Sequence, residues 1–102
     1  MRQYTTPEQT AKLIEFGFAE PNSEGVRSIS DTKVEFYPAY SIGELIEMLP
    51  PYIGRWDLDI FHDWHFERWV VCIDPENYTT AATELIDALY NMIVKLKEDK
   101  IL

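Results

Sequence analysis

The spacing of apolar residues predicts three helices, the first of them near the start of the chain. Thr6 and Gln9 form a capping box, and Pro7 takes the first helical position, where proline is well tolerated. Gly17 is a common helix terminator. The pattern therefore predicts a helix over residues 7–16, and its expected buried side consists of Ala11, Ile14 and Phe18.

Two further helices show the same apolar spacing. Ser41 and Glu44 form a second capping box, and the short helix that follows ends at a Pro-Pro pair; its apolar side consists of Ile42, Leu45, Ile46 and Leu49. Thr79 or Thr80 caps the last helix, which we expect over residues 81–98 with a length of about 27 Å. Its apolar stripe consists of Ala82, Leu85, Ile86, Leu89, Ile93 and Leu96.

Alternation of polar and apolar residues over shorter stretches predicts strands. Residues 33–37 alternate and end at Pro38, which is typical of a short strand with one solvated face. Residues 20–30 are rich in turn-forming residues and lack periodicity, so we expect a loop there, with at most a short strand at residues 26–29. The motif DPEN at residues 74–77 predicts a turn.

The stretch over residues 52–73 predicts a β-hairpin. Residues 55–60 alternate, with Trp56, Leu58 and Ile60 on one face, and residues 68–73 are rich in Trp and Val. A loop within residues 62–65 joins the two strands. The predicted register pairs apolar residues with each other, namely Leu58 with Trp69 and Trp56 with Val71, and it pairs the acidic Asp59 with the basic Arg68.

These elements predict a single domain over residues 1–102 with an α+β fold in the order α-β-α-β-β-α. We expect an antiparallel sheet of three or four strands with the three helices packed mainly on one face. A chain of 102 residues that is 46% hydrophobic supports one core. No apolar run is long enough to span a membrane and no signal peptide is evident, which predicts a cytoplasmic protein. The one cysteine, Cys72, is expected to be a small core residue.

The charge balance narrows the range of partners. The chain has 18 acidic and 9 basic residues, so its net charge is -9. We do not expect direct binding to nucleic acid, because such binding requires clustered Lys and Arg side chains. Within residues 44–87, ten acids accompany only two bases, Arg55 and Arg68. The acids either keep the protein soluble or imitate the phosphate backbone of a nucleic acid.

The candidates for chemistry are few. His62 and His65 have the spacing of metal ligands at the hairpin tip, and the predicted register places them opposite each other, but Asp63 points to the other face and a third ligand is missing. Asp57 and Asp59 are candidates for paired carboxylates, although an ion pair of Asp59 with Arg68 is the simpler interpretation. No phosphate-binding loop or nucleophile motif occurs. We therefore expect no enzyme activity and no cofactor.

Aromatic residues are the remaining unusual feature. Phe61, Trp64 and Phe66 gather at the predicted hairpin tip, and a sheet face without helices is expected to hold Tyr37, Val70 and Cys72. These rings either form a binding surface for a partner or fill gaps in the core. The leading hypothesis is a protein-interaction module, homodimeric or bound to another protein through Asp57, Asp59, Phe61, Trp64 and Phe66. The alternatives are an acidic mimic of nucleic acid that inhibits another protein, and a metal-dependent enzyme that uses the hairpin tip.

Two stretches of the chain, together with its opening, resemble a known group of proteins. YSIGELIEMLP at residues 40–50 and ELIDALYNMIVKLKEDKIL at residues 84–102, with the opening TTPEQTAKLIEFGF, resemble a group of small proteins of gut Bacteroidetes that are associated with phage or mobile elements. The resemblance covers roughly half of the chain and includes no catalytic or ligand-binding motif. Because no activity is established for that group, the resemblance assigns no functional residue.

Overall fold

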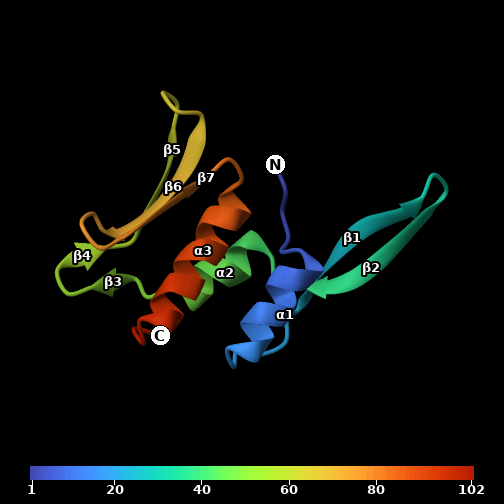
Figure 1. Cartoon of the computed structure of the whole chain (residues 1–102), viewed down its shortest axis with the longest axis horizontal. Helices are drawn as coiled ribbons and strands as arrows, with labels where there is room; N and C mark the ends of the chain where they lie inside the picture. The colour runs from blue at the N-terminus through green and yellow to red at the C-terminus, as the bar shows by residue number, and fades with distance from the viewer.

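The computed structural model describes residues 1–102 and shows an α+β fold of three helices and seven short strands (Figure 1). In chain order the elements are α1 (Pro7–Glu15), β1 (Ser23–Ser30), β2 (Lys33–Ala39), α2 (Ile42–Met48), β3 (Tyr52–Ile53), β4 (Trp56–Asp57), β5 (Asp59–Asp63), β6 (Arg68–Asp74), β7 (Tyr78–Ala82) and α3 (Leu85–Glu98). None of the helices has the length and apolar character that crossing a bilayer requires.

The strands form three separate antiparallel sheets instead of the one sheet expected. β1 pairs only with β2, β3 pairs only with β4, and the largest sheet has the order β5-β6-β7. The expected loop at residues 20–30 is therefore wrong, because most of it is the full strand β1. The start of the expected last helix is also wrong, since residues 78–82 pair with β6 as strand β7.

The helices begin where side chains satisfy their first N–H groups. α1 and α2 start at the two predicted capping boxes, with Gln9 N–H donating to Thr6 Oγ1 at 3.1 Å and Glu44 N–H donating to Ser41 Oγ at 3.1 Å. α3 starts after Glu84, which makes no side-chain cap. The Thr80 hydroxyl, expected as a possible cap, donates instead to the Ala88 carbonyl at 2.7 Å and ties β7 to α3.

The core surrounds α3. Its buried side chains come from α3, from the inner face of β6 and from α2 with its C-cap, with Leu13 and Tyr40 at one side: Leu13, Tyr40, Leu45, Leu49, Val71, Ile73, Leu85, Ile86, Ala88, Leu89, Met92, Ile93 and Leu96. α3 packs against β6 and β7, and α2 packs against α3. The helices therefore do not form one layer over a sheet, because α2 and α1 lie beyond α3 (Figure 1).

α1 buries a different side from the one expected. Thr10 and Leu13 are buried, whereas Ala11 is exposed and Ile14 is 40% exposed. Phe18, the third residue of the expected side, is half-buried against the core. The reason is the segment before α1, because the Thr5 hydroxyl is buried and lies 2.7 Å from the Thr10 hydroxyl. Two buried hydroxyls that satisfy each other fix which side of α1 faces inward.

The hairpin β5–β6 forms, but its register differs from the expected one. Asp59 lies opposite Cys72, His62 opposite Trp69, and Asp63 opposite Arg68, so the pair of Leu58 with Trp69 is wrong. The turn occupies residues 64–67, and Glu67 adopts a positive φ of 51° there. Leu58 interrupts the strand expected at residues 55–60, because its N–H donates to the Pro51 carbonyl at 2.9 Å.

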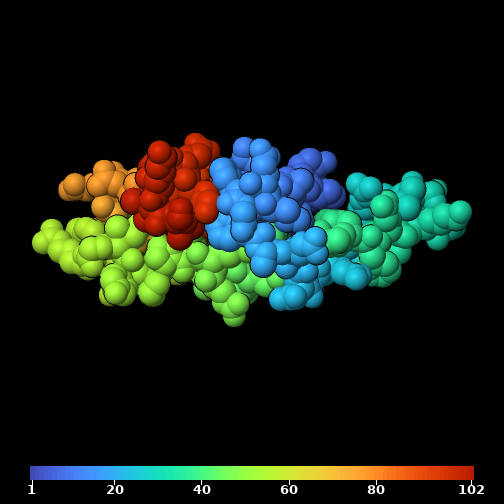
Figure 2. Space-filling view, turned by 90° about the horizontal axis from the view of Figure 1, so that it is seen from below, coloured from blue at the N-terminus to red at the C-terminus, as the bar shows by residue number.

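The molecule is long and thin. Its extents are 49 × 35 × 18 Å and its radius of gyration is 14.4 Å, compared with about 13 Å for a compact domain of this length. The accessible surface of 6546 Å² likewise exceeds the roughly 6,000 Å² typical of this mass. The excess comes from the hairpins β1–β2 and β5–β6, which extend away from the helices (Figure 1), and Figure 2 shows β1–β2 at one end of the molecule.

Candidate protein-interaction surfaces

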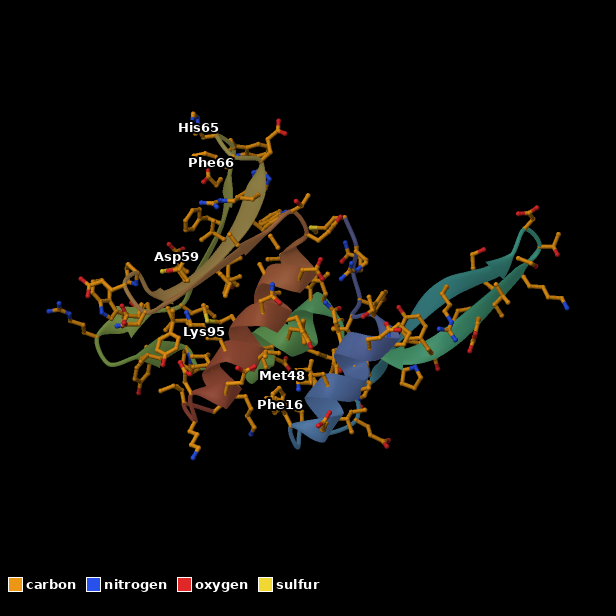
Figure 3. All side chains as sticks on the ribbon, in the orientation of Figure 1. Phe16, Met48, Asp59, His65, Phe66 and Lys95 are labelled. Atoms are coloured by element: carbon orange, nitrogen blue, oxygen red, sulfur yellow. The ribbon has the colours of Figure 1, made fainter.

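The tip of hairpin β5–β6 exposes two large aromatic side chains. Trp64 is 81% exposed and Phe66 is 65% exposed, and both belong to the turn at residues 64–67. Figure 3 shows Phe66 and His65 at the outer end of the hairpin, away from the helices. We call Trp64, His65 and Phe66 the aromatic tip. A tryptophan exposed to this degree buries a large apolar area when a partner covers it.

The Asp63 carboxylate holds the aromatic tip in one conformation. Asp63 Oδ1 accepts hydrogen bonds from the N–H groups of His65 at 3.1 Å and Phe66 at 3.3 Å. Its other oxygen, Oδ2, lies 3.6 Å from Arg68 Nε across the hairpin. The Arg68 guanidinium in turn lies 5.0 Å from the centre of the Phe66 ring. The exposed rings are therefore attached to a turn that the protein itself orders.

The expected aromatic cluster is divided between the two faces of the hairpin. Val71 and Ile60, which lies opposite it across the hairpin, both face α3. Phe61 and Val70 therefore lie on the opposite face, which we call the outer face. Phe66 contacts Arg68, whose register position is on the outer face. Trp64 lies on the other side, where its ring centre is 4.1 Å from that of His62. A partner that closes over the tip therefore contacts rings on both sides of it.

The outer face has the composition expected for a sheet face without helices, with one exception. It carries Asp59, Phe61, Val70 and Cys72 by register. Tyr37, expected there, belongs to β2 and donates its hydroxyl to the Thr5 carbonyl at 3.0 Å. Cys72 is half-buried outside the core, so its expected place in the core is wrong; its sulfur accepts from the Thr79 hydroxyl at 3.4 Å.

The two aspartates proposed for the site remain on the surface. Asp59 is exposed opposite Cys72, and its expected ion pair with Arg68 is wrong because Arg68 pairs with Asp63. Asp57 is exposed in β4 opposite Tyr52. The break at Leu58 separates the two strands that carry these carboxylates. They form a negative border at the base of the hairpin and do not form a pair in one strand.

The histidines are not arranged as a metal site. His62 lies opposite Trp69 and packs between Trp64 and Trp69, with its Nδ1 buried and without a hydrogen-bond partner, while His65 lies in the turn with its ring against Phe66. The expected opposition of the two histidines is therefore wrong. No group of three or more His, Cys, Asp or Glu side chains comes together in a way that could hold a metal ion.

A second exposed apolar surface lies on the hairpin β1–β2, which we call the arm. Val26, Val34 and Phe36 are 52%, 58% and 63% exposed, and Ile29 near the turn is 61% exposed. The sequence reading missed this surface because it assigned most of β1 to a loop. The signal was nevertheless present, since Val26 and Ile29 interrupt an otherwise polar stretch.

The base of the arm is fixed to the body by a small polar network. Thr5 N–H donates to the Tyr40 carbonyl at 3.0 Å, and Tyr40 N–H donates to Thr5 Oγ1 at 3.0 Å. The Tyr37 hydroxyl reaches the Thr5 carbonyl from the arm itself. Because Thr5 is fully buried, these bonds form away from water. The arm therefore leaves the body in a defined direction, although nothing in the chain covers it.

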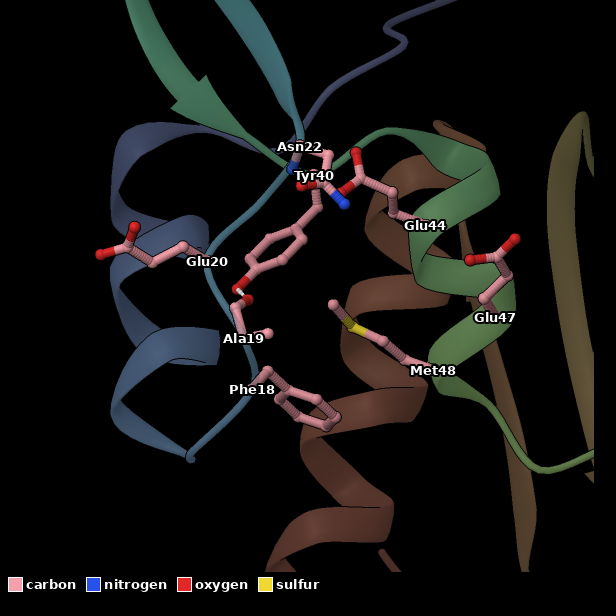
Figure 4. A pocket seen from close by; sticks show the side chains of 8 residues that line it. All are labelled: Phe18, Ala19, Glu20, Asn22, Tyr40, Glu44, Glu47 and Met48. Atoms are coloured by element: carbon pink, nitrogen blue, oxygen red, sulfur yellow. Dashed lines mark hydrogen bonds between the residues drawn. The ribbon is translucent and has the colours of Figure 1, made fainter.

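One hollow of about 230 Å³ lies between α2 and the segment that follows α1 (Figure 4). It is lined by Phe18, Ala19, Glu20, Asn22, Tyr40, Glu44, Glu47 and Met48. The Tyr40 hydroxyl donates to the Ala19 carbonyl, and Glu44 accepts from Asn22 N–H at 2.9 Å. Burial, and then the charges of Glu44 and Glu20, raise the pKa of Tyr40 above 10.0. The hollow is smaller than most ligand sites, and its inner polar groups bind each other.

Comparison with protein-family models, with curated proteins and with solved structures finds no match to this chain.

Proposed function

We propose that the protein is a non-catalytic interaction module that binds another protein through the aromatic tip of hairpin β5–β6. The observation that carries the proposal is Trp64, which is 81% exposed on a turn that the Asp63 carboxylate orders. An ordered ring loses little conformational freedom when a partner binds it, so most of the gain from its burial contributes to affinity. Tryptophan is also among the residues that most often dominate the binding energy of an interface.

The surroundings of the tip indicate the chemistry of the partner. Asp57 and Asp59 are exposed at the base of the hairpin, and the chain as a whole has a net charge of -9. A partner that fits this surface presents an apolar pocket for the rings and basic side chains beside it. The charges then accelerate the encounter and orient the partner, while the rings supply the affinity.

A capture experiment in the native host tests this proposal. The tagged wild-type chain and its Trp64→Ala variant are used to isolate partners, and the affinity of the captured protein is then measured for each. We expect Trp64→Ala to weaken binding by about 30-fold or more, as for a central interface tryptophan. Trp56→Ala is the matched control, because Trp56 is 38% exposed in β4 beside Arg55 and lies outside the tip. Equal affinity of the Trp64→Ala variant and the wild type would refute the proposal.

The alternative of nucleic-acid mimicry has less support from the arrangement of acids. Asp63 orders the turn, Asp74 accepts from Glu76 N–H and from the Asn77 amide, and Asp87 pairs with Arg2, so these carboxylates are used within the protein. The same assay separates the two functions. Mimicry predicts loss of binding in Asp57→Asn with Asp59→Asn and a steep decrease with salt, whereas the tip proposal predicts slower association with only a modest loss of affinity in that double variant and a shallow decrease with salt.

A further inference from the structure

The strand β5 leaves one edge of the largest sheet open. β5 forms one margin of that sheet and β7 the other (Figure 1). β5 pairs only with β6, and no backbone hydrogen bond outside that ladder involves residues 59–63. The backbone groups on the far side of β5 therefore face solvent. Such an edge is a template on which an extended segment of another chain can add a strand.

β5 lacks the features that close the other edges of this protein. Edge strands are commonly blocked by lysine, proline, bulges, short length or a covering helix. β2 contains Lys33 and Pro38, and the register of β1 with β2 is irregular between Ser28 and Ser30. β3 and β4 have two residues each, and only two residues separate β7 from α3, which packs against it. β5 has the sequence DIFHD and a regular ladder, without lysine or proline.

The side chains of β5 indicate what kind of segment fits its edge. Asp59 and Phe61 share the outer face, where Asp59 is exposed without an ion-pair partner and Phe61 is 44% exposed. At the other end of β5, Asp63 already pairs with Arg68. Residues directly opposite each other on neighbouring strands interact most closely. An added strand therefore gains from a basic side chain opposite Asp59 and an apolar one opposite Phe61.

We propose that β5 binds an extended, basic segment of the partner protein, which adds as a fourth strand to the sheet β5-β6-β7. This inference rests on the proposed function, because it describes how the partner of the aromatic tip is held beside the tip. Backbone hydrogen bonds supply affinity in this binding mode, and alternate side chains supply specificity. The turn at residues 64–67 directly follows β5, so one partner covers the strand and the tip together.

A second copy of the chain fits this edge poorly. The antiparallel two-fold pairing that uses all five residues of β5 places Phe61 opposite itself and Asp59 opposite Asp63. Like charges directly opposite each other destabilise a strand pair. Arg68 neutralises part of the Asp63 charge, and the net charge of -9 on each copy adds to the repulsion. A basic segment is attracted by the same charges, so the edge favours it over a second copy.

Two synthetic peptides with blocked ends test the proposal. One is Lys-Thr-Val-Thr-Lys, and the other has glutamate in place of both lysines; the symmetric sequences allow either strand direction. NMR of the isotope-labelled chain in about 0.15 M salt follows the binding, with long-range charge effects screened. The lysine peptide should shift the amide resonances of β5 with a dissociation constant on the order of 1 mM, because five residues bury little area. The glutamate peptide should bind about tenfold more weakly.

Charge reversal at Asp59 tests the pairing itself. Asp59→Lys should reduce the preference for the lysine peptide from about tenfold to less than about twofold, because the charge opposite the peptide has changed sign. Asp57→Lys is the matched control, since it changes the net charge equally but lies in β4, outside the ladder. That variant should keep the preference of the wild type. Both positions are exposed, so folding is expected to be unaffected, and circular dichroism checks it.

The peptide test is separable from the test of the aromatic tip. The peptides offer no pocket for a ring, so Trp64→Ala should bind them like the wild type. Absence of β5 shifts up to about 10 mM lysine peptide overturns the strand addition and leaves the tip proposal untouched. Equal loss of preference in Asp57→Lys and Asp59→Lys overturns the pairing in favour of general charge attraction. A free chain of doubled mass with β5 amides protected from exchange overturns the proposal in favour of a second copy.

Discussion

At the scale of single residues, the base of the arm depends on one close approach of a ring to the backbone. A Cβ atom at Gly25 would lie 2.5 Å from Tyr37 Cζ and 2.7 Å from its hydroxyl oxygen. The ring cannot simply swing aside, because its hydroxyl donates to the buried Thr5 carbonyl. Only glycine at position 25 therefore allows the bond that connects the arm to the segment before α1.

Gly25→Ala should destabilise the protein by about 1–3 kcal/mol, through overpacking and loss of the Tyr37 hydrogen bond. Gly43→Ala is the matched control in α2, where the nearest atom to an added Cβ is Ser41 Oγ at 3.8 Å. That variant should be stabilised by about 0.5–1 kcal/mol, since alanine favours a helix. Urea unfolding measures both changes. Equal stabilities for the two variants would show that the Tyr37 contact does not contribute to the stability of the fold.

At the scale of elements, the capping box of α2 also connects two parts of the fold. Glu44 Oε1 accepts from Ser41 N–H at 3.0 Å, and its other oxygen accepts from Asn22 N–H just before β1. Partial burial by itself would raise the pKa of Glu44, but hydrogen bonds from the Ser23 hydroxyl and from the backbone of Asn22 and Ser41 outweigh it and hold the pKa below 4.5. The charged form therefore stabilises the native state.

Glu44→Gln should lower the stability by about 1 kcal/mol at pH 7, a typical value for a cap. Because the folded pKa is depressed, the stabilisation is present above pH 4.5, the unfolded value, and is lost as the pH falls through the folded pKa. The difference between wild type and variant in urea unfolding should thus shrink between pH 5 and pH 3. Asp74, whose pKa a hydrogen bond from Asn77 lowers, titrates in both proteins and cancels in the comparison.

The control for that measurement is Glu47→Gln, an exposed position on the same helix that receives no hydrogen bond. At pH 7 that variant should match the wild type in stability to within about 0.5 kcal/mol, because the substitution removes no hydrogen bond. A difference for Glu44→Gln that is constant from pH 7 to pH 3 would contradict the role of the charged carboxylate.

At the scale of the whole molecule, stability is unevenly distributed. Only 18 of 102 residues are buried, and most of them surround α3. Within the arm only Gly25 and Ala39 are buried, both near its base, and neither belongs to the core around α3. Regions with few buried contacts open with a lower free energy than the core does. The arm is therefore expected to open independently of the body.

Hydrogen exchange should show this difference directly. Amides of the β1–β2 ladder should exchange orders of magnitude faster than those at Leu89, Met92 and Ile93 in α3, which lose protection only on global unfolding. Exchange followed by mass spectrometry or NMR checks the expectation. Arm amides protected as strongly as those of α3 would contradict an arm held only at its base.

The candidate surfaces were predictable to different degrees. The sequence located Trp64 and Phe66 at a hairpin tip, whereas Phe61 lies within β5 opposite Val70, and the true register left the residues of β5 and β6 on their expected faces. The reason is that the expected and observed registers differ by an even number of residues, and strand side chains alternate with a period of two. The position of the turn caused the error, because the turn occupies residues 64–67 instead of lying within residues 62–65, so the ladder ends at the pair of Asp63 with Arg68. The apolar arm was missed because glycine and serine in β1 are typical of loops.

By itself, the sequence determined the features that depend on neighbours along the chain: both capping boxes, the apolar stripe of α3 and the hairpin at the tip. Tertiary structure decided which side of α1 is buried, where β7 ends and α3 begins, and that β1 pairs with β2 outside the main sheet. The physical reason is that these outcomes depend on partners distant in sequence. A hydroxyl at Thr5 or a partner strand at β6 provides no signal within the local pattern.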